Sequence, residues 1–236
     1  MRLDKFLSEC TDYSRKEIKK AIKAGTVFVN KEPALRCDEK IDELKDEVVL
    51  NGEEIFYKKY VYLMMNKPKG VVSATWDGDK PYVTELVADD FWHFEVFPVG
   101  RLDIDTEGLL ILTNDGDFNH RMTSPKSKVY KKYFARLSEP AEEKDIEVFK
   151  NGIEFSDFTS KPAMLEICEN PKEVYISICE GKFHQVKRMC AYVGKNVEYL
   201  KRVSIGTLEL DEDLQPGEYR RMSEEELEKV FKTAEE

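Results

Sequence analysis

The sequence predicts an α+β protein in which a small helical and β-hairpin module precedes a larger region built on a mostly antiparallel mixed sheet. Helical periodicity is concentrated near the N-terminus, where apolar residues recur on one face. Beyond residue 60, short apolar strands are joined by connections of variable length, without the regular strand–helix alternation of a doubly wound fold. A boundary near 56–60 divides the chain into predicted domains at residues 1–59 and 60–236.

The predicted N-terminal domain begins with two helices. Residues 2–7 are a short amphipathic start. Ser14 and Glu17 then match a capping box, in which the two side chains satisfy free N–H groups at a helix start. Gly25 is placed to end this second helix, because glycine readily adopts the left-handed conformation found after a helix. The remaining elements of this domain are predicted strands at residues 26–29 and 48–50.

The predicted second domain combines strands and helices in irregular order. Strands are assigned to apolar runs at residues 61–65, 109–112, 133–137, 164–168 and 174–178. Helices are assigned to residues 142–150, 186–192 and 223–231. This order favours a sheet whose neighbouring strands are mostly antiparallel.

The composition favours a cytoplasmic protein with a packed core. The chain is 41% hydrophobic, which is enough apolar material for a core. No apolar run approaches the roughly 20 residues of a membrane span, and the charged start lacks the apolar stretch of a secretion signal. The five cysteines form no C-x-x-C pair. We therefore expect buried thiols in a reducing compartment, with no disulfide framework and no zinc site.

Charge is distributed unevenly along the chain. The net charge of −10 by itself argues against a polyanionic partner. However, residues 119–136 contain six basic and no acidic residues, and residues 182–202 and 14–23 are also basic. The basic residues of the predicted second helix recur beside its apolar stripe: Arg15, Lys16, Lys19, Lys20 and Lys23. They either neutralise nucleic-acid phosphates or form an ordinary solvated face, and the charge pattern alone leaves both interpretations open.

The most informative chemical pattern is GRLDIDTEGLLILTNDG at residues 100–116. Asp103 lies between Leu102 and Ile104, so its carboxylate is expected to be partly desolvated and suited to acid–base or nucleophilic chemistry. A calcium loop starting at this residue would need a bidentate Glu at its twelfth position, where the sequence has Asn114. A structural turn, with carboxylates that accept hydrogen bonds from the backbone, is the other alternative.

This string resembles the signature of pseudouridine synthases of the RsuA branch, which modify ribosomal RNA. The resemblance extends over the whole chain. Residues 1–59, with MRLDKFLSE, SRKEIKKAIKAG and VFVNKE, resemble an S4 RNA-binding module. The strings VYLMMNKPKGVVSAT, KKYFARL and EGKFHQVKRMC resemble further motifs of the pseudouridine synthase catalytic domain. The strings MRLDKFLS and VYLMMNKP are more similar to the small-subunit enzymes than to the large-subunit enzymes.

The resemblance implies roles for four catalytic-site residues. The Asp of the G-R-L-D motif, here Asp103, is the catalytic residue, and Arg101 of the same motif helps to displace the target base. Tyr133 of the K-x-Y motif packs against the target uracil, although a tyrosine taken alone is more often a core residue than a stacking partner. Lys187, the basic residue after H-Q-V, pairs with the catalytic Asp.

Three residues near Lys187 in the sequence carry further expectations. The resemblance places Val186 against the aromatic ring of the tyrosine. Arg188 is next in line for the ion pair and is a candidate RNA contact. His184 is expected to be a hydrogen-bonded structural histidine and not an acid–base group.

The implied reaction detaches uracil from C1′ and rejoins it through carbon, with no change in oxidation state. It requires a carboxylate but no cofactor and no metal. The expected partner is ribosomal RNA, as 16S rRNA or an assembling small subunit, bound by a monomer away from membranes. The resemblance implies the class that forms pseudouridine 516. Two alternatives stay open: a large-subunit (23S) rRNA synthase, and a non-catalytic rRNA-binding assembly factor.

Overall fold

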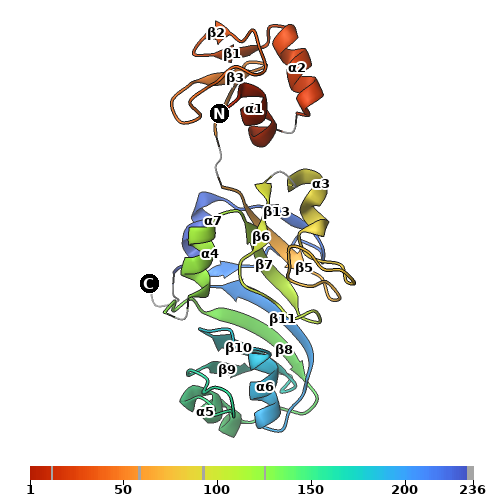
Figure 1. Ribbon diagram of the computed structural model, residues 1–236. Coiled ribbons are helices and arrows are strands. Elements are labelled where there is room, and N and C mark those ends of the chain that lie inside the picture. Colours follow the sequence, from red (N-terminus) through yellow and green to blue (C-terminus); the bar gives the residue numbers. More distant parts are fainter. Residues whose placement is uncertain (12, 58–59, 92–93, 125, 233–236) are drawn as a thin grey trace. The chain divides into compact units, whose positions relative to one another are not determined.

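The computed structural model describes residues 1–11, 13–57, 60–91, 94–124 and 126–232. Its backbone forms two compact units (Figure 1). The first unit comprises Met1–Tyr60 together with Asp90–Glu95, and the second comprises Val61–Asp89 together with Val96–Glu236.

Unit 1 packs two helices with a four-stranded antiparallel sheet. The helices are α1 (Leu3–Cys10) and α2 (Arg15–Lys23). The strands, in the order β2-β1-β3-β4, are β2 (Glu32–Pro33), β1 (Val27–Val29), β3 (Val48–Leu50) and β4 (Glu53–Ile55). The buried core of this unit is contributed by both helices and the strands, with Leu3, Phe6, Leu7, Ile18, Val27 and Val48 among its members. Apolar periodicity therefore predicted which face of each helix is buried.

Helix α2 begins and ends where its capping residues predict. The Ser14 side chain accepts a hydrogen bond from the Glu17 N–H at 3.3 Å, and the Ser14 N–H donates to the Glu17 carboxylate at 2.9 Å. Gly25 follows the helix with φ of +70°, a conformation that glycine adopts without steric cost. The capping box and the helix end are thus confirmed.

Unit 2 is built on a nine-stranded mixed sheet. Along the main path the strands run β13 (Tyr219–Arg221), β5 (Tyr62–Lys67), β7 (Glu107–Thr113), β11 (Val197–Ile205), β8 (Lys131–Leu137), β10 (Glu173–Ile178) and β9 (Met164–Ile167). Two short strands lie off this path: β6 (Phe97–Pro98) pairs with β7, and β12 (Leu208–Glu209) pairs with β11. Among the strands that the structure describes, only β7 and β11 pair in parallel. The predicted mixed, mostly antiparallel sheet is therefore confirmed.

The helices of unit 2 cover the sheet in separate groups. Helices α4 (Gly116–Thr123) and α7 (Glu224–Lys229) lie near the β5–β7 region, where Met64, Leu109, Phe118 and Val230 belong to one buried cluster. Helix α5 (Glu143–Asn151) packs against β9, and α6 (Gln185–Tyr192) packs against β11 (Figure 1). A short 3-10 helix at Glu85–Val87 continues into α3 (Ala88–Phe91).

The structure contains elements that were not predicted, among them helix α4 and strand β13, and it differs from the expectation in the burial of the thiols. Strand β11 was not predicted, although it lies between β7 and β8 inside the sheet. Its sequence VEYLKRVSI is interrupted by charged residues, and one of them, Arg202, is buried. The thiols were expected to be buried. Cys190 alone is buried, and the other four cysteines are half-buried. Burial raises the pKa of the Cys190 thiol to about 12.

The sequence predicts that no segment spans a membrane, and the described helices can be compared with that prediction. None of them combines the length and the apolar character that a bilayer span requires.

Candidate active site

The loop that carries Asp103 is held in place by hydrogen bonds to its backbone. The Ser73 hydroxyl accepts from the Leu102 N–H at 3.0 Å and donates to the Leu102 carbonyl at 2.9 Å. The Gly70 N–H donates to the Ile104 carbonyl at 2.7 Å, and the Thr106 N–H donates to the Asp103 carbonyl at 3.1 Å. These bonds leave the carboxylate of Asp103 free to face other partners.

A buried lysine donates hydrogen bonds to backbone carbonyls of the same loop. Lys67, at the end of β5, is fully buried. Its Nζ atom donates to the carbonyl oxygens of Asp103 at 3.2 Å, Thr106 at 3.0 Å and Pro68 at 3.0 Å. Burial lowers the pKa of Lys67 from its ordinary value of 10.5 to about 8, against the opposing charges of Asp105 and Asp103. Lys67 therefore fixes the loop through its backbone and not through the carboxylate.

The ammonium group of Lys187 bridges two carboxylates of the loop. Its Nζ atom lies 2.9 Å from Oδ2 of Asp103 and 2.5 Å from Oδ1 of Asp105. Burial disfavours the charged forms, but the hydrogen bonds prevail, so the pKa of Lys187 is raised and that of Asp105 is lowered. Lys187 lies on α6, in the helix's first turn. The structure thus places Lys187 beside Asp103, as the resemblance implied, and adds Asp105 as a second partner.

The third carboxylate of the string points elsewhere. Glu107 opens β7 and accepts a hydrogen bond from the Tyr199 hydroxyl at 2.8 Å. Asn114, at the twelfth position of the alternative calcium loop, accepts from the Val61 N–H at 2.9 Å. Because these oxygens do not converge with those of Asp103 and Asp105, the geometry does not form a calcium loop. Within the described chain, no three His, Cys, Asp or Glu side chains form a group that could hold a metal ion.

His184 lies beside the carboxylate of Asp103, which the sequence did not predict. Its Nε2 atom is 3.7 Å from Oδ1 of Asp103 and its side chain is 43% exposed. It adopts a left-handed backbone conformation with φ of +49° immediately before α6. Its ring stacks on that of Phe183 with 3.8 Å between the centroids. The expectation of a hydrogen-bonded structural histidine is therefore wrong, because its ring stacks at the surface and makes no hydrogen bond among the described residues.

Of the other predicted site residues, Tyr133 and Val186 are buried and Arg101 is exposed. Tyr133 is buried on β8, directly opposite Arg202 of β11. Val186 is buried in the first turn of α6, next to Lys187. Arg101 is exposed, and within the described chain its guanidinium makes no hydrogen bond or ion pair.

Arg188 is engaged away from Asp103. Its two terminal nitrogens pair with the carboxylate of Asp157 at 3.0 and 2.5 Å. The guanidinium also lies over the rings of Phe155 and Phe158, 4.7 Å from each centroid. The expectation that Arg188 is next in line for the ion pair with Asp103 is therefore wrong, because the adjacent helical position points it to a different partner.

Comparison with known proteins identifies the family. The sequence model of the RNA pseudouridylate synthase family matches residues 61–192, which is more than half of the chain. The chain belongs to this family. The RsuA-branch resemblance read from the motifs is confirmed by full-length relatives.

Three matches show how far the similarity extends. The synthase is 46% identical over 231 residues to the uncharacterized RNA pseudouridine synthase YtzG of Bacillus subtilis, covering 96% of this chain and 97% of that protein. It is 41% identical over 234 residues to the ribosomal small subunit pseudouridine synthase A of Vibrio cholerae, covering 98% and 100% respectively. A crystal structure of a pseudouridylate synthase matches with a TM-score of 0.69 and 37% identity, covering 98% of this chain and 99% of that chain. As a pseudouridine synthase, the protein is an isomerase with the mixed-sheet fold of its family.

The synthase also contains buried cations that the sequence did not reveal. Arg202 is 2% exposed, and its Nε donates to the Leu109 carbonyl at 2.7 Å. Gly108 allows the backbones of β7 and β11 to approach closely, because a Cβ atom there would lie 2.2 Å from the Arg202 carbonyl oxygen. Burial and the charge of Arg202 lower the pKa of Lys131 to about 8. Apolar periodicity gives no signal for such residues, since lysines and arginines are ordinarily assigned to the surface.

Proposed function

We propose that this synthase converts one uridine of 16S ribosomal RNA to pseudouridine, with Asp103 as the catalytic residue. The observation that carries the proposal is the Asp103–Lys187 contact of 2.9 Å, formed on a loop that Lys67 and Ser73 hold by its backbone. The choice of RNA is supported by relatives about 40% identical over nearly the whole chain that are named ribosomal small subunit pseudouridine synthase A. A non-catalytic assembly factor would have no use for this carboxylate–ammonium pair.

The reaction breaks the N1–C1′ bond of uridine and forms a C5–C1′ bond. The hydrogen of C5 is removed and N1 gains one, so atoms and oxidation state balance without a further reactant. The carboxylate of Asp103 either attacks the sugar or removes a proton from it, and both roles require the ionised form. The ammonium of Lys187 contacts this carboxylate and offsets its negative charge within the site. None of the steps requires a cofactor.

The target base must leave its helix to reach the carboxylate. We assign Tyr133 and Val186 to the walls of the base pocket and Arg101 to the displacement of the base. Burial of Tyr133 and Val186 supports the first role, because a flipped base is held between aromatic and apolar side chains. Exposure of the Arg101 guanidinium beside Asp103 in the chain supports the second role.

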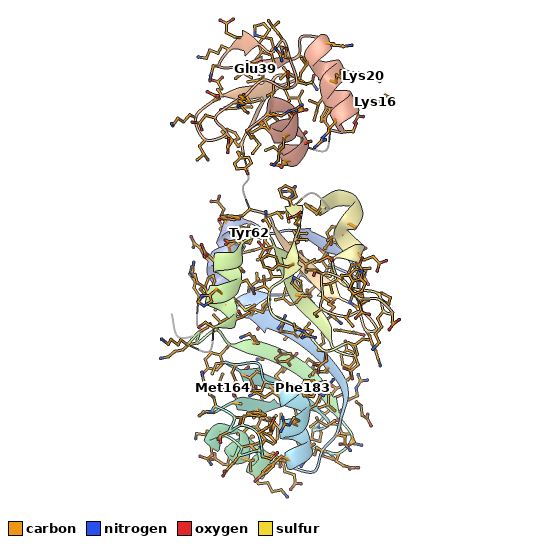
Figure 2. All side chains as sticks on the ribbon, in the orientation of Figure 1. Lys16, Lys20, Glu39, Tyr62, Met164 and Phe183 are labelled. Atoms are coloured by element: carbon orange, nitrogen blue, oxygen red, sulfur yellow. The ribbon has the colours of Figure 1, made fainter. Side chains whose placement is uncertain are left out.

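We assign RNA binding to unit 1 as an S4-like domain, with residues 1–59 as its extent. The five basic side chains of α2 are exposed, while Ile18 and Ile22 face the core. Figure 2 shows Lys16 and Lys20 on this helix. Cations presented in this way neutralise phosphates without reading sequence. Arg188 is a weaker RNA-binding candidate, because Asp157 already pairs with its guanidinium. We further propose that the synthase acts as a monomer in the cytoplasm.

The test is to map pseudouridine in both ribosomal RNAs of a strain that lacks the synthase. Deletion should remove one pseudouridine from 16S rRNA, at the position equivalent to 516. Wild-type protein should restore it and Asp103→Asn should not. Loss of a 23S pseudouridine instead would assign the large-subunit alternative, and unchanged maps would favour the assembly factor. Purified protein with naked 16S rRNA and with small-subunit assembly intermediates would then identify the form of the substrate.

A further inference from the structure

An exposed aromatic stack lies next to the catalytic carboxylate. Phe183 is 75% exposed, one of the most exposed large apolar side chains in the described chain. Its ring stacks on that of His184, with 3.8 Å between centroids and 18° between planes. The other end of the His184 ring approaches Asp103, with Nε2 3.7 Å from Oδ1. Figure 2 shows Phe183 near the start of α6. The His184 side chain thus lies between the exposed Phe183 ring and the Asp103 carboxylate.

The loop that presents Phe183 is fixed at both ends by Gln185, which is buried. The Lys182 N–H donates to Oε1 of Gln185 at 2.9 Å, and the Gln185 N–H donates to the Lys182 carbonyl at 3.1 Å. Nε2 of Gln185 donates to the Glu180 carboxylate at 2.8 Å, and the Lys161 N–H donates to the same oxygen at 2.8 Å. The loop therefore holds Phe183 in an exposed position through hydrogen bonds on both sides of it.

The backbone of His184 is held in an unusual conformation. A left-handed conformation is uncommon for a residue other than glycine and persists only where surrounding contacts enforce it. Here the His184 carbonyl accepts the first hydrogen bond of α6, from the Arg188 N–H at 2.9 Å. The same helix turn carries Lys187 to Asp103. The orientation of the stack and the position of the ion pair are thus set by one structural element.

An exposed ring next to a site that acts on RNA is suited to stacking on a base, since every base presents a π face. The target uracil is assigned to the buried Tyr133, so the exposed ring is available for a different base. We propose that Phe183, backed by His184, stacks on the base of the nucleotide next to the target uridine. In this role Phe183 is a positioning residue that holds the flanking strand while the uridine is flipped. The proposal rests on the RNA substrate of the proposed function.

A competing role for the ring is to shield Asp103 from water. The two roles make different demands on the side chain. Shielding requires apolar bulk, which leucine supplies as well as phenylalanine does. Stacking requires a planar ring, which tyrosine retains and leucine lacks. Substitutions at an exposed position leave the core intact, so all three variants Phe183→Ala, Phe183→Leu and Phe183→Tyr are informative.

The experiment measures the affinity of the full-length chain for a 16S rRNA fragment that contains the target uridine. Two further fragments carry an abasic nucleotide, one on the 5′ side of the target and one on the 3′ side. Tyr192→Ala is the matched control, because Tyr192 is a 61% exposed aromatic residue at the opposite end of α6. Pseudouridine formation by the wild type on the unmodified fragment checks the proposed function separately. Its absence would contradict the 16S assignment, whereas the stacking proposal is decided by affinity.

Phe183→Ala and Phe183→Leu should weaken binding by roughly 5- to 150-fold, the range observed for loss of one base–aromatic stack. Phe183→Tyr and Tyr192→Ala should bind like the wild type. One of the two abasic fragments should bind the wild type as weakly as the intact fragment binds Phe183→Ala. Phe183→Ala should bind that abasic fragment with no further loss of affinity. Wild-type affinity in Phe183→Leu, or additive losses with both abasic fragments, would overturn the proposal.

Discussion

The Nζ atom of Lys187 lies 2.9 Å from Oδ2 of Asp103, although 84 positions separate the two residues in the sequence. The loop before β7 supplies the carboxylate, and the first turn of α6 supplies the ammonium. The same ammonium also contacts Asp105. One cation is therefore shared by two carboxylates at the proposed catalytic site.

Asp103→Asn should abolish catalysis while leaving the fold and RNA binding intact. The amide has the shape of the carboxylate but carries no charge, so it neither attacks nor accepts a proton effectively. We expect the single-turnover rate to fall by at least about 100-fold. Asp105→Asn is the matched control, since it makes the same chemical change at the second carboxylate bound by Lys187. Equal losses in the two variants would contradict the assignment of Asp103.

Lys187→Met should move the acidic limb of the pH–rate profile to higher pH. In the wild type, Lys187 lowers the pKa of Asp105 against the effect of burial. Without the ammonium, two neighbouring carboxylates share a partly buried site, and the pair binds its first proton at a higher pH. Activity that the variant loses on the acidic side should thus recover in part as the pH rises.

The measurement is the single-turnover rate at saturating RNA across the pH range. Arg188→Met is the control, because Arg188 pairs with Asp157 and should leave the profile in place. Lys187→Arg should retain part of the wild-type profile, since it preserves the charge. An unshifted profile in Lys187→Met would remove the ion pair from the mechanism.

Activity should survive treatment with EDTA. Lys187 already occupies the position between Asp103 and Asp105 where a metal ion would have to sit, at 2.9 and 2.5 Å from their oxygens. The assay should use an RNA fragment whose fold is verified after chelation, because RNA itself binds divalent ions. Loss of activity that one divalent ion restores, with the RNA fold unchanged, would reverse this expectation.

Comparison of the wild type with Lys67→Met should show how the buried ammonium makes the free energy of unfolding depend on pH. The pKa of Lys67 is lowered from 10.5 to about 8 by burial, so between these values the folded state binds fewer protons than the unfolded state. The free energy of unfolding of the wild type, relative to the variant, should therefore increase as the pH rises from 8 to about 10.5. The full increase is about 3 kcal/mol.

Urea denaturation at each pH measures this difference, with the exposed Lys69, two residues away, changed to Met as the control. The control should show no such increase relative to the wild type. Below pH 8 the difference between wild type and Lys67→Met should be constant, because Lys67 is protonated in both states. A difference that stays flat up to pH 10.5 would show that the folded protein does not lower the pKa of Lys67.

The exposed lysines of α2 should control the salt dependence of RNA binding. Replacing Lys16, Lys19 and Lys20 with Ala should reduce the slope of log affinity against log salt by about 0.7–0.9 for each RNA phosphate that the protein no longer neutralises. The same replacement at Lys5, Lys40 and Lys45 removes an equal charge from unit 1 outside α2. Equal slopes in the two triple variants would show that the α2 lysines are a solvated face.

The local elements were largely predictable from the sequence. Ser14 and Glu17 marked the start of α2 because a capping box is a contact between residues three positions apart. Apolar runs marked β5, β7, β8, β9 and β10, since the alternation and length of a strand are properties of a short segment. Asp103 stood out because its neighbours and the following apolar strand form one continuous string.

Only the tertiary structure decided which distant groups meet. Periodicity gave no signal for β11, because its buried Arg202 is stabilised by the Leu109 carbonyl on another strand. Nothing in the sequence indicated that the ammonium of Lys67 donates to three backbone carbonyls, because two of them lie more than 30 positions away. Arg188 and His184 could not be placed from their position in the HQVKR string. Successive residues of an α-helix are rotated by about 100° around its axis. Lys187 therefore faces Asp103, while Arg188 faces Asp157. Interactions within one segment follow from the sequence, whereas the partner of a charged side chain depends on which segments the fold brings together.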